Sequence, residues 1–283
     1  MKEKTSVLVC ALLLLGVSLC WCIGAPDAGD ACSDVTGQKE MLVYLNLLQG
    51  EIDGALAGLD GQVEATAGNL TATGLAGADA DAELNDALAA DPSVTTAITI
   101  ARNGTCLAAV PESVASLVGE DLGGREVVRE TFEKKVPIMT DVIPLHEGGQ
   151  AAIIEYPVFG EDECLAGAMS ITFDPYLLCK EKIEPVLNGT PYTAMVAEAG
   201  GRVLYDPDPE EVGKETFNES LYEAFPEILA FAHTYAGNWS GHATYSFYDT
   251  GFSRTVQKEA YWTTVGLYGT EWRLIIIREL GGA

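Results

Sequence analysis

Arg125 has the clearest binding chemistry in this chain. It opens a predicted helix from about Gly124 to Lys134, and Arg129 and Phe132 follow on the same helical face. A planar guanidinium can hold a carboxylate through two parallel, charge-assisted hydrogen bonds. The pattern raises the question of whether Arg125 faces a pocket for something anionic, with Arg129 and Phe132 on one wall of it.

A purely structural role would produce the same pattern. Arg125 could be a helix-start arginine that pairs with Glu126 or Asp121, and Phe132 could be ordinary core. The two interpretations differ in one respect, since a binding protein needs Arg125 to face a closed cavity, whereas a structural protein would leave it in solvent.

Signals for catalysis or metal binding are weak. The three histidines, His146, His233 and His242, share no metal-ligand spacing, and the chain contains no GxSxG, HExxH or phosphate-cradling GxxxxGK[ST] motif. Asp206 to Glu211 reads DPDPEE, which could bind calcium but is equally typical of a rigid, solvated loop. We therefore expect no enzyme, no metal site and no cofactor.

The charge balance excludes one class of partner. The chain has 42 acidic and 16 basic residues, a formal net charge of -26. So acidic a surface repels phosphate backbones, which makes nucleic-acid binding improbable. It indicates a solvated, soluble surface.

The N-terminus carries an export signal. Lys2, Glu3 and Lys4 precede an uncharged, mostly apolar segment from Thr5 to Pro26. Its length lies between that of a cleaved signal peptide and that of a membrane span. Either one would place the rest of the chain outside the cytoplasm, at the cell surface or secreted.

Two further features agree with export. Five of the seven asparagines lie in Asn-x-Ser/Thr sites, which predicts surface glycosylation at Asn69, Asn103, Asn188, Asn218 and Asn238. Four cysteines remain beyond the leader, an even number that is consistent with two disulfides in an oxidising compartment. The pairs we expect are Cys106 with Cys164 and Cys32 with Cys179.

The elements that must position these residues belong to an α+β chain. Apolar spacings of three and four predict a long amphipathic helix from Val35 to about Leu70, and a short helix follows around Ala82 to Ala90. A hairpin at Asn103-Gly104, the helix of Arg125 and three further strands come next. The predicted strands are Val94–Arg102, the CLAAV segment, Ile138–Ile143, Ala151–Phe159 and Cys164–Phe173.

The same order then repeats. Asp174-Pro175 begins a linking helix, and a second hairpin turns at Gly200-Gly201. A helix that begins with Asn218 as its cap and runs to Gly237, followed by three strands, completes the second copy. The pattern predicts two stacked lobes along one helical spine.

The ordered motifs of these lobes resemble those of the double Cache extracellular sensor domains of prokaryotic receptors. The distal-lobe motifs are Gly119-Glu120-Asp121-Leu122, Arg125, Thr140-Asp141-Val142, Glu155-Tyr156-Pro157-Val158 and Ala166-Gly167-Ala168. The proximal-lobe motifs are Gly200 to Pro209, Gly213, Trp262 and Trp272. The resemblance implies two PAS-like antiparallel-sheet lobes after a long N-terminal helix.

It also implies a small-molecule pocket in the distal lobe, with Arg125 as the clamp for the ligand's carboxylate. In amino-acid-binding members two aromatic residues follow this arginine and an acidic residue on the last strand holds the ammonium. Those places are Val127, Val128 and about Thr172 here. A small carboxylate or another polar organic ligand therefore suits the site better than an ordinary amino acid.

Thr140 and Tyr156 lie on strands that would frame this pocket, beside Arg129, Phe132 and Thr172. Glu155 and Asp141 are expected to be solvated or capping groups. The ligand-binding residues we predict are Arg125, Arg129, Phe132, Thr140, Tyr156 and Thr172.

The expected organisation has five parts: residues 1–25 as signal peptide or membrane anchor, 26–93 as the long and short helices, 94–174 as the distal lobe, 175–190 as the linking helix and 191–283 as the proximal lobe. The function we expect is that of a small-molecule sensor that signals through a separate membrane partner or a homodimer, with ligand scavenging as a close variant. The alternatives are a surface structural or adhesive glycoprotein and, third, an exported hydrolase.

Overall fold

The computed structural model of the chain describes residues 28–146, 148–249 and 253–281, with side chains from residue 35 onward. The chain divides into two units, residues 1–38 and 39–283. Only the beginning of helix α1 is described in the first unit, and the predicted leader, residues 1–25, lies outside the described residues. No helix within the described ranges is long and apolar enough to span a membrane.

Helix α1 (Ala28–Thr73) buries one stripe of side chains and leaves its glycines on the other side. Its buried residues recur at spacings of three and four: Met41, Leu45, Leu48, Ile52, Leu56, Leu59 and Val63. A methyl group added at any of five glycines of this helix would meet nothing within 4 Å. Since each glycine costs a helix about 0.5–1 kcal/mol relative to alanine, packing of the stripe must hold the helix.

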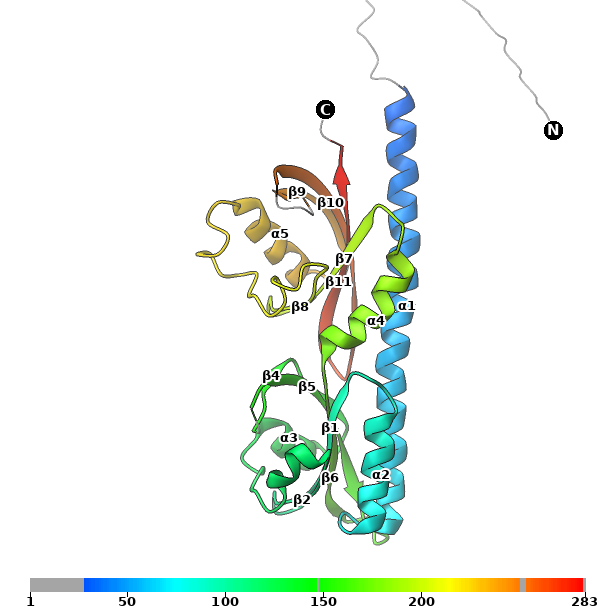
Figure 1. Cartoon of the computed structure of the whole chain (residues 1–283), viewed down its shortest axis with the longest axis vertical. Helices are drawn as coiled ribbons and strands as arrows, with labels where there is room; N and C mark the ends of the chain where they lie inside the picture. The colour runs from blue at the N-terminus through cyan, green and yellow to red at the C-terminus, as the bar shows by residue number, and fades with distance from the viewer. Residues whose placement is uncertain (1–27, 147, 250–252, 282–283) are drawn as a thin grey trace, which may run out of the picture. The chain divides into compact units, whose positions relative to one another are not determined.

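The distal lobe is an antiparallel sheet with helix α3 on one face and α1 on the other (Figure 1). Its strands lie in the order β2-β1-β6-β5-β3, and the short β4 also pairs with β5. The elements are α2 (Ala78–Ala89), β1 (Val94–Ala101), β2 (Cys106–Val110), the 3-10 helix η1 (Glu112–Leu117), α3 (Glu126–Lys134), β3 (Ile138–Met139), β4 (Ile143–Pro144), β5 (Gln150–Phe159) and β6 (Leu165–Phe173).

The proximal lobe repeats this arrangement. Its strands lie in the order β8-β7-β11-β10-β9, so the last strand of each lobe again pairs with the first. The elements are α4 (Pro175–Leu187), β7 (Tyr192–Glu198), β8 (Val203–Tyr205), α5 (Pro226–Gly237), β9 (Gly241–Tyr248), β10 (Thr255–Leu267) and β11 (Thr270–Leu280). The predicted repeat of two antiparallel-sheet lobes is confirmed.

Two local predictions are wrong. The helix expected from Asn218 begins only at Pro226, because a proline disfavours helical backbone at the residue before it. Asn218 instead lies in a turn, where its side chain accepts hydrogen bonds from Ser220. The strand expected from Ile138 to Ile143 is two short strands, each paired with β5.

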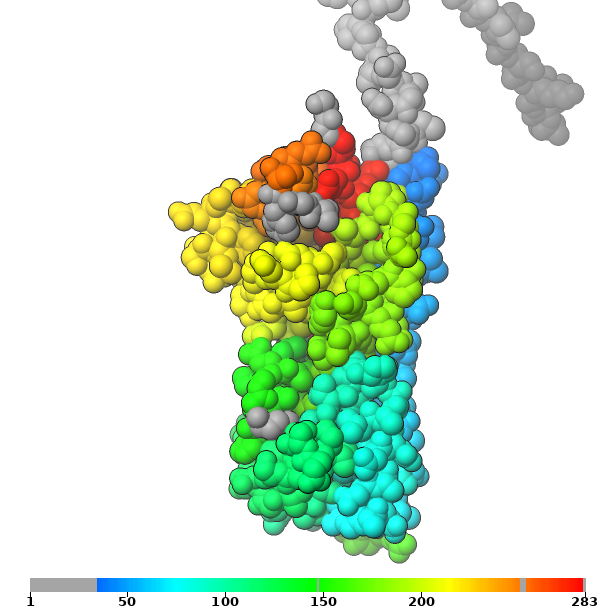
Figure 2. Space-filling model, in the orientation of Figure 1, coloured from blue at the N-terminus to red at the C-terminus, as the bar shows by residue number. Residues whose placement is uncertain are grey.

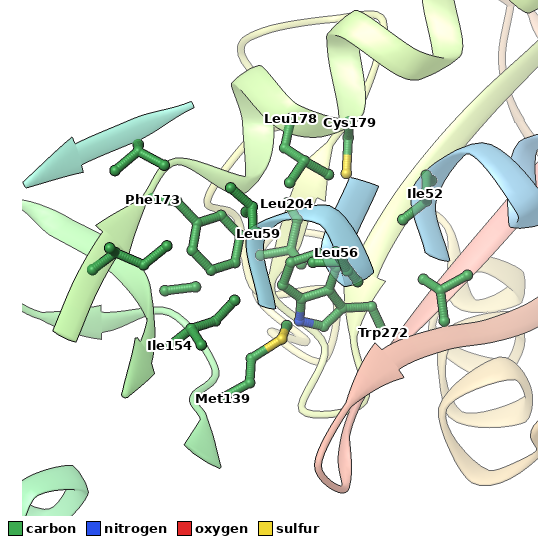
Figure 3. Packing of buried hydrophobic residues seen from close by; sticks show 14 of the residues in the cluster. Ile52, Leu56, Leu59, Met139, Ile154, Phe173, Leu178, Cys179, Leu204 and Trp272 are labelled. Atoms are coloured by element: carbon green, nitrogen blue, oxygen red, sulfur yellow. The ribbon is translucent and has the colours of Figure 1, made fainter. Parts of the chain in front are cut away.

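One hydrophobic core joins α1, α4 and the sheets of both lobes. In the close-up of Figure 3, Trp272 of β11 lies among Leu56 of α1 and Met139 and Phe173 of the distal lobe. Hydrogen bonds across the lobes accompany this packing, from Val142 N to Glu198 Oε1 at 2.6 Å and from Thr270 Oγ1 to Met139 O at 2.6 Å. Figure 2 shows the distal lobe (green) directly against the yellow and yellow-green segments of the proximal lobe.

The linking helix α4 is capped as its sequence predicts. Asp174 precedes Pro175, and its Oδ1 accepts a hydrogen bond of 2.9 Å from Tyr176 N. We expect Asp174→Ala to lower the free energy of unfolding by about 1 kcal/mol. Glu181→Ala, at an exposed position of the same helix, should change it by less than about 0.5 kcal/mol. Denaturant titration compares them, and equal midpoints for both variants would contradict a stabilising cap.

The predicted disulfides are wrong for the cysteines whose side chains the structure describes. Cys106, Cys164 and Cys179 take part in no disulfide. Cys106 lies on β2 and Cys164 lies just before β6, and β1 separates these strands, so the cysteines lie about two strand spacings apart, beyond the reach of an S–S bond. Cys179 is fully buried in the core, and the side chain of Cys32 lies outside the described residues.

Candidate functional site

Arg125 lies at the start of α3, facing the edge of the distal sheet. Its backbone N–H donates to Leu122 O at 3.0 Å, which fixes the turn that leads into the helix. Its guanidinium donates from Nη2 to Pro144 O of β4 at 2.8 Å. Arg125 is therefore partly buried and held against β4, rather than paired with Glu126 or Asp121.

A small, partly open cavity lies beneath Arg125, between α3 and the sheet. Its volume is about 20 Å³, which is room for about one water molecule. Apolar side chains of β1, η1 and α3 form most of its wall, and its polar lining comes from Thr96, Arg125, Glu155, Ser170 and Thr172.

Glu155 of β5 brings a buried carboxylate to this cavity. Only 1% of the residue is exposed, and among the described residues neither its Oε1 nor the neighbouring Thr131 Oγ1 has a hydrogen-bond partner. Burial raises the pKa of Glu155 to about 7, and the nearby hydroxyls of Thr131 and Ser170 and the charge of Arg125 oppose this rise only in part. An unsatisfied buried carboxyl is costly, so the cavity favours a hydrogen-bond donor beside it.

The prediction of a solvated or capping Glu155 is therefore wrong. β5 lies inside the sheet with both faces covered, and five consecutive positions, Ala151 to Glu155, are buried. The sequence does contain a signal for this burial, because Glu155 lies two residues after the apolar Ile153 and therefore on the same face of β5. In the structure Glu155 also lies opposite Ser170 on β6.

Of the six predicted ligand-binding residues, Arg125 and Thr172 line the cavity. The Thr172 hydroxyl lies 2.7 Å from the hydroxyls of both Thr95 and Thr96. Arg129 is exposed, and Phe132 is half-buried against the core beneath α3.

Thr140 and Tyr156 have other contacts. Thr140 Oγ1 accepts a hydrogen bond from Ile153 N at 3.1 Å. Tyr156 lies on the opposite face of β5 from Glu155, where its hydroxyl bonds Asp60 of α1 at 2.7 Å and the hydroxyl of Tyr268 at 2.6 Å. The side chain of Tyr156 therefore joins the distal sheet to α1 and to the β10–β11 turn.

A second pocket lies in the proximal lobe, at the equivalent place between α5 and its sheet. Its volume is about 300 Å³, and the loop from Asp206 to Glu211 forms part of its wall. Within the described ranges, no group of three or more His, Cys, Asp or Glu side chains is arranged so that it could hold a metal ion.

Comparison with known proteins identifies this architecture. Residues 54–175 match the family described as HK/GC/Chemotaxis protein-like, sensor domain. An extracellular ligand-binding receptor from Desulfohalobium retbaense superposes with a TM-score of 0.69 and 25% identity, over 84% of this chain and 40% of that chain. The two-lobed architecture is that of the Cache-like sensor domains.

The two-lobed fold is also similar to that of two chemoreceptor domains. That of Pseudomonas fluorescens CtaA, in complex with L-isoleucine, has a TM-score of 0.63 and 14% identity, over 90% of this chain and 97% of that chain. That of the Pseudomonas aeruginosa amino acid chemoreceptor PctC, in complex with GABA, has a TM-score of 0.56 and 19% identity, over 88% and 100%.

These two likenesses concern the fold alone, and the chain spans 40% of the length of the Desulfohalobium receptor. No curated protein matches the chain. The matched family is one of sensor domains, so residues 54–175 belong to a ligand-binding rather than a catalytic type of domain.

Proposed function

We propose that the chain is an extracytoplasmic sensor that binds a small carboxylate-bearing molecule in its distal lobe. The observation that carries this proposal is the convergence of Arg125 and the buried Glu155 carboxyl on one small cavity. A guanidinium beside a cavity can hold a carboxylate through two hydrogen bonds. The unsatisfied Glu155 oxygen offers an acceptor for a donor group on the same ligand.

The ligand class that suits both groups is a small amino acid or a related zwitterion. The acid expected on the last strand is replaced by Thr172, whose hydroxyl already contacts Thr95 and Thr96. Glu155 on the neighbouring strand supplies the missing negative charge instead. Similar chemoreceptor domains were solved with L-isoleucine and GABA, which agrees with this class.

A ligand would have to enlarge the cavity, since its present volume holds about one water molecule. The contact that stands in the way is the hydrogen bond from Arg125 to Pro144 O of β4. A ligand carboxylate that takes Arg125 would free β4. Such a change is a shift between two states of the lobe, one with the present cavity and one with the enlarged cavity. The ligand drives the shift because it binds the state with the enlarged cavity more tightly.

The segment around β4 also touches the proximal lobe, which gives the sensor a route for its signal. Two residues before Pro144, Val142 N donates to Glu198 of β7, and Thr270 of β11 donates to Met139 O of β3. Movement of β3 and β4 would therefore change the contacts of this segment with β7 and β11 of the proximal sheet. Output would pass to a separate membrane partner or to a second copy of the chain, with residues 1–25 as export signal or anchor.

A thermal-shift and calorimetric screen with L-isoleucine, GABA and propionate tests this proposal. A ligand at about 100 times its Kd should stabilise the fold by about 2.7 kcal/mol, a rise in Tm of several degrees. Arg125→Ala should weaken binding at least about tenfold, because a charge-assisted contact is lost. Arg129→Ala, four residues later on the same helix and exposed, is the matched control and should bind as the parent does.

Glu155→Gln separates ligand classes. It should weaken the binding of a zwitterion and leave that of propionate unchanged. Silence across the panel, or equal binding by Arg125→Ala and Arg129→Ala, would contradict a distal-lobe sensor. Either outcome would favour the alternative, a surface structural glycoprotein. The exposure of all five predicted glycosylation asparagines is compatible with that alternative.

A further inference from the structure

The proximal-lobe pocket has a wall of aromatic rings. It lies between α5 and the face of the sheet formed by β7, β9, β10 and β11, with the loop after β8 across it. The rings of Phe231 and Tyr245 stack with centroids 4.4 Å apart, and those of Tyr222 and Phe247 lie 6.3 Å apart. The six rings of the wall belong to Tyr222, Phe231, Tyr235, Tyr245, Phe247 and Tyr248.

Negative charge predominates around these rings. Asp206, Asp208, Glu211 and Asp249 line the pocket together with one basic residue, Lys258. Glu211 is already bound, because Lys214 Nζ lies 2.8 Å from its Oε1 and the Tyr222 hydroxyl donates to its Oε2.

Asp206 retains an available oxygen. Its Oδ1 accepts a hydrogen bond from Asp208 N at 2.9 Å, and among the described residues its Oδ2 accepts none. Burial raises the pKa of Asp206 to about 6, and the charges of Glu211 and Asp208 add to this rise. A cation in the pocket would relieve this electrostatic cost.

Tyr245 is a second polar group without a partner. Only 4% of the residue is exposed, it lines the pocket, and its hydroxyl makes no hydrogen bond to any residue that the structure describes. The hydroxyls of Tyr235 and Tyr222 differ in this respect, since Thr216 and Glu211 bind them. A hydroxyl that lines a pocket and has no protein partner indicates a place for a polar ligand group.

Lys258 stands beside Tyr245 on the neighbouring strand. Its Nζ lies 5.9 Å from the ring centroid of Phe247 and forms no ion pair within the described ranges. Burial lowers the pKa of Lys258, although the charges of Glu279, Asp206 and Asp249 oppose this effect. The pocket thus holds an available cation at one place and an available carboxylate at another.

We propose that this pocket is a second ligand site, for a small organic ammonium compound whose positive nitrogen lies against Asp206 and the surrounding rings. Aromatic faces attract an ammonium group through their quadrupole, most strongly where water is excluded. The carboxylates supply the countercharge, and Lys258 can hold an anionic group at the other end of the ligand. At about 300 Å³ the pocket is at the lower end of ligand-pocket volumes, which suits a small molecule.

Titration calorimetry of the purified chain with glycine betaine and choline tests this assignment. Their tert-butyl analogues, dimethylbutanoate and dimethylbutanol, have the same shape but carry carbon in place of the charged nitrogen. The ammonium compounds should bind at least about tenfold more tightly than their analogues, because only they interact electrostatically with the rings and Asp206. Equal binding of a compound and its analogue would overturn the proposal.

Three variants locate the site. Asp206→Asn keeps an acceptor for Asp208 N and removes the charge, so it should weaken binding of both compounds at least about tenfold. Tyr245→Phe should weaken it less, and Glu210→Gln, in the same loop but outside the pocket lining, should not change it. Unchanged binding by Asp206→Asn, or no binding of either compound at millimolar concentration, would overturn the assignment.

This site is independent of the distal one. Arg125→Ala should bind glycine betaine as the parent does, and Asp206→Asn should bind any distal ligand as the parent does. A silent distal screen with a positive result here, or the reverse, therefore shows which of the two proposals has failed. Loss of betaine binding in Arg125→Ala would contradict a proximal site.

Discussion

Trp272→Ala is expected to lower the free energy of unfolding by about 3–5 kcal/mol, the usual range for removal of a large buried aromatic side chain. Trp272 is fully buried on β11 and contacts the core of both lobes. Its ring centroid lies 6.2 Å from that of Phe173, the last residue of the distal sheet. Truncation would therefore leave a cavity where α1 and the two sheets meet.

The exposed Trp239 provides the matched control. It is 74% exposed, so Trp239→Ala should change stability by less than about 0.5 kcal/mol. Trp272→Phe should cost less than Trp272→Ala, since it keeps most of the ring and removes an indole N–H that has no partner among the described residues. Urea unfolding followed by circular dichroism measures all three, and a small loss for Trp272→Ala would contradict a shared core.

The second large effect is on pH. We expect the protein to be more stable near pH 5 than near pH 7.5. Burial raises the pKa of Glu155 and of Glu198 to about 7, and that of Asp206 to about 6. Because the folded state binds protons more tightly than the unfolded chain, this stability is present below about pH 4.5 and is lost as the pH rises through about 7. For Glu155 alone the effect is on the order of 3 kcal/mol at most.

Glu155→Gln isolates this contribution from the general repulsion of a chain with a net charge of -26. The variant should be more stable than the parent at pH 7.5 and should lose less stability between pH 5 and 7.5. Glu161→Gln, at an exposed carboxyl in a turn, removes the same charge and should keep the parent's slope. Chemical unfolding at several pH values checks this, and parallel slopes for parent and Glu155→Gln would contradict a raised pKa of the buried Glu155.

Pattern and turn chemistry were sufficient to predict most elements of both lobes. Strands such as Tyr192–Glu198 and Thr270–Leu280 are β-branched and apolar, and turn signals separate them. The hairpin at Asn103-Gly104 depends on a residue that tolerates a positive φ, and Gly104 has a φ of 90°. The start of α5 was missed because the turn that holds Asn218 resembles a helix cap in sequence.

The two candidate sites were predictable to different degrees. Sequence alone determined that this chain is acidic and that it has two lobes of one repeated architecture on a long helix. It also determined that Arg125 begins the helix beside the distal sheet. These features were predictable because periodicity, turn residues and charge are local properties. Tertiary structure decided that Glu155 is buried, that Tyr156 faces α1, that the distal cavity is small and that the proximal pocket is larger. Those facts depend on which face of each strand is covered and on how side chains from separate elements fill the space between them, and no local pattern encodes that packing.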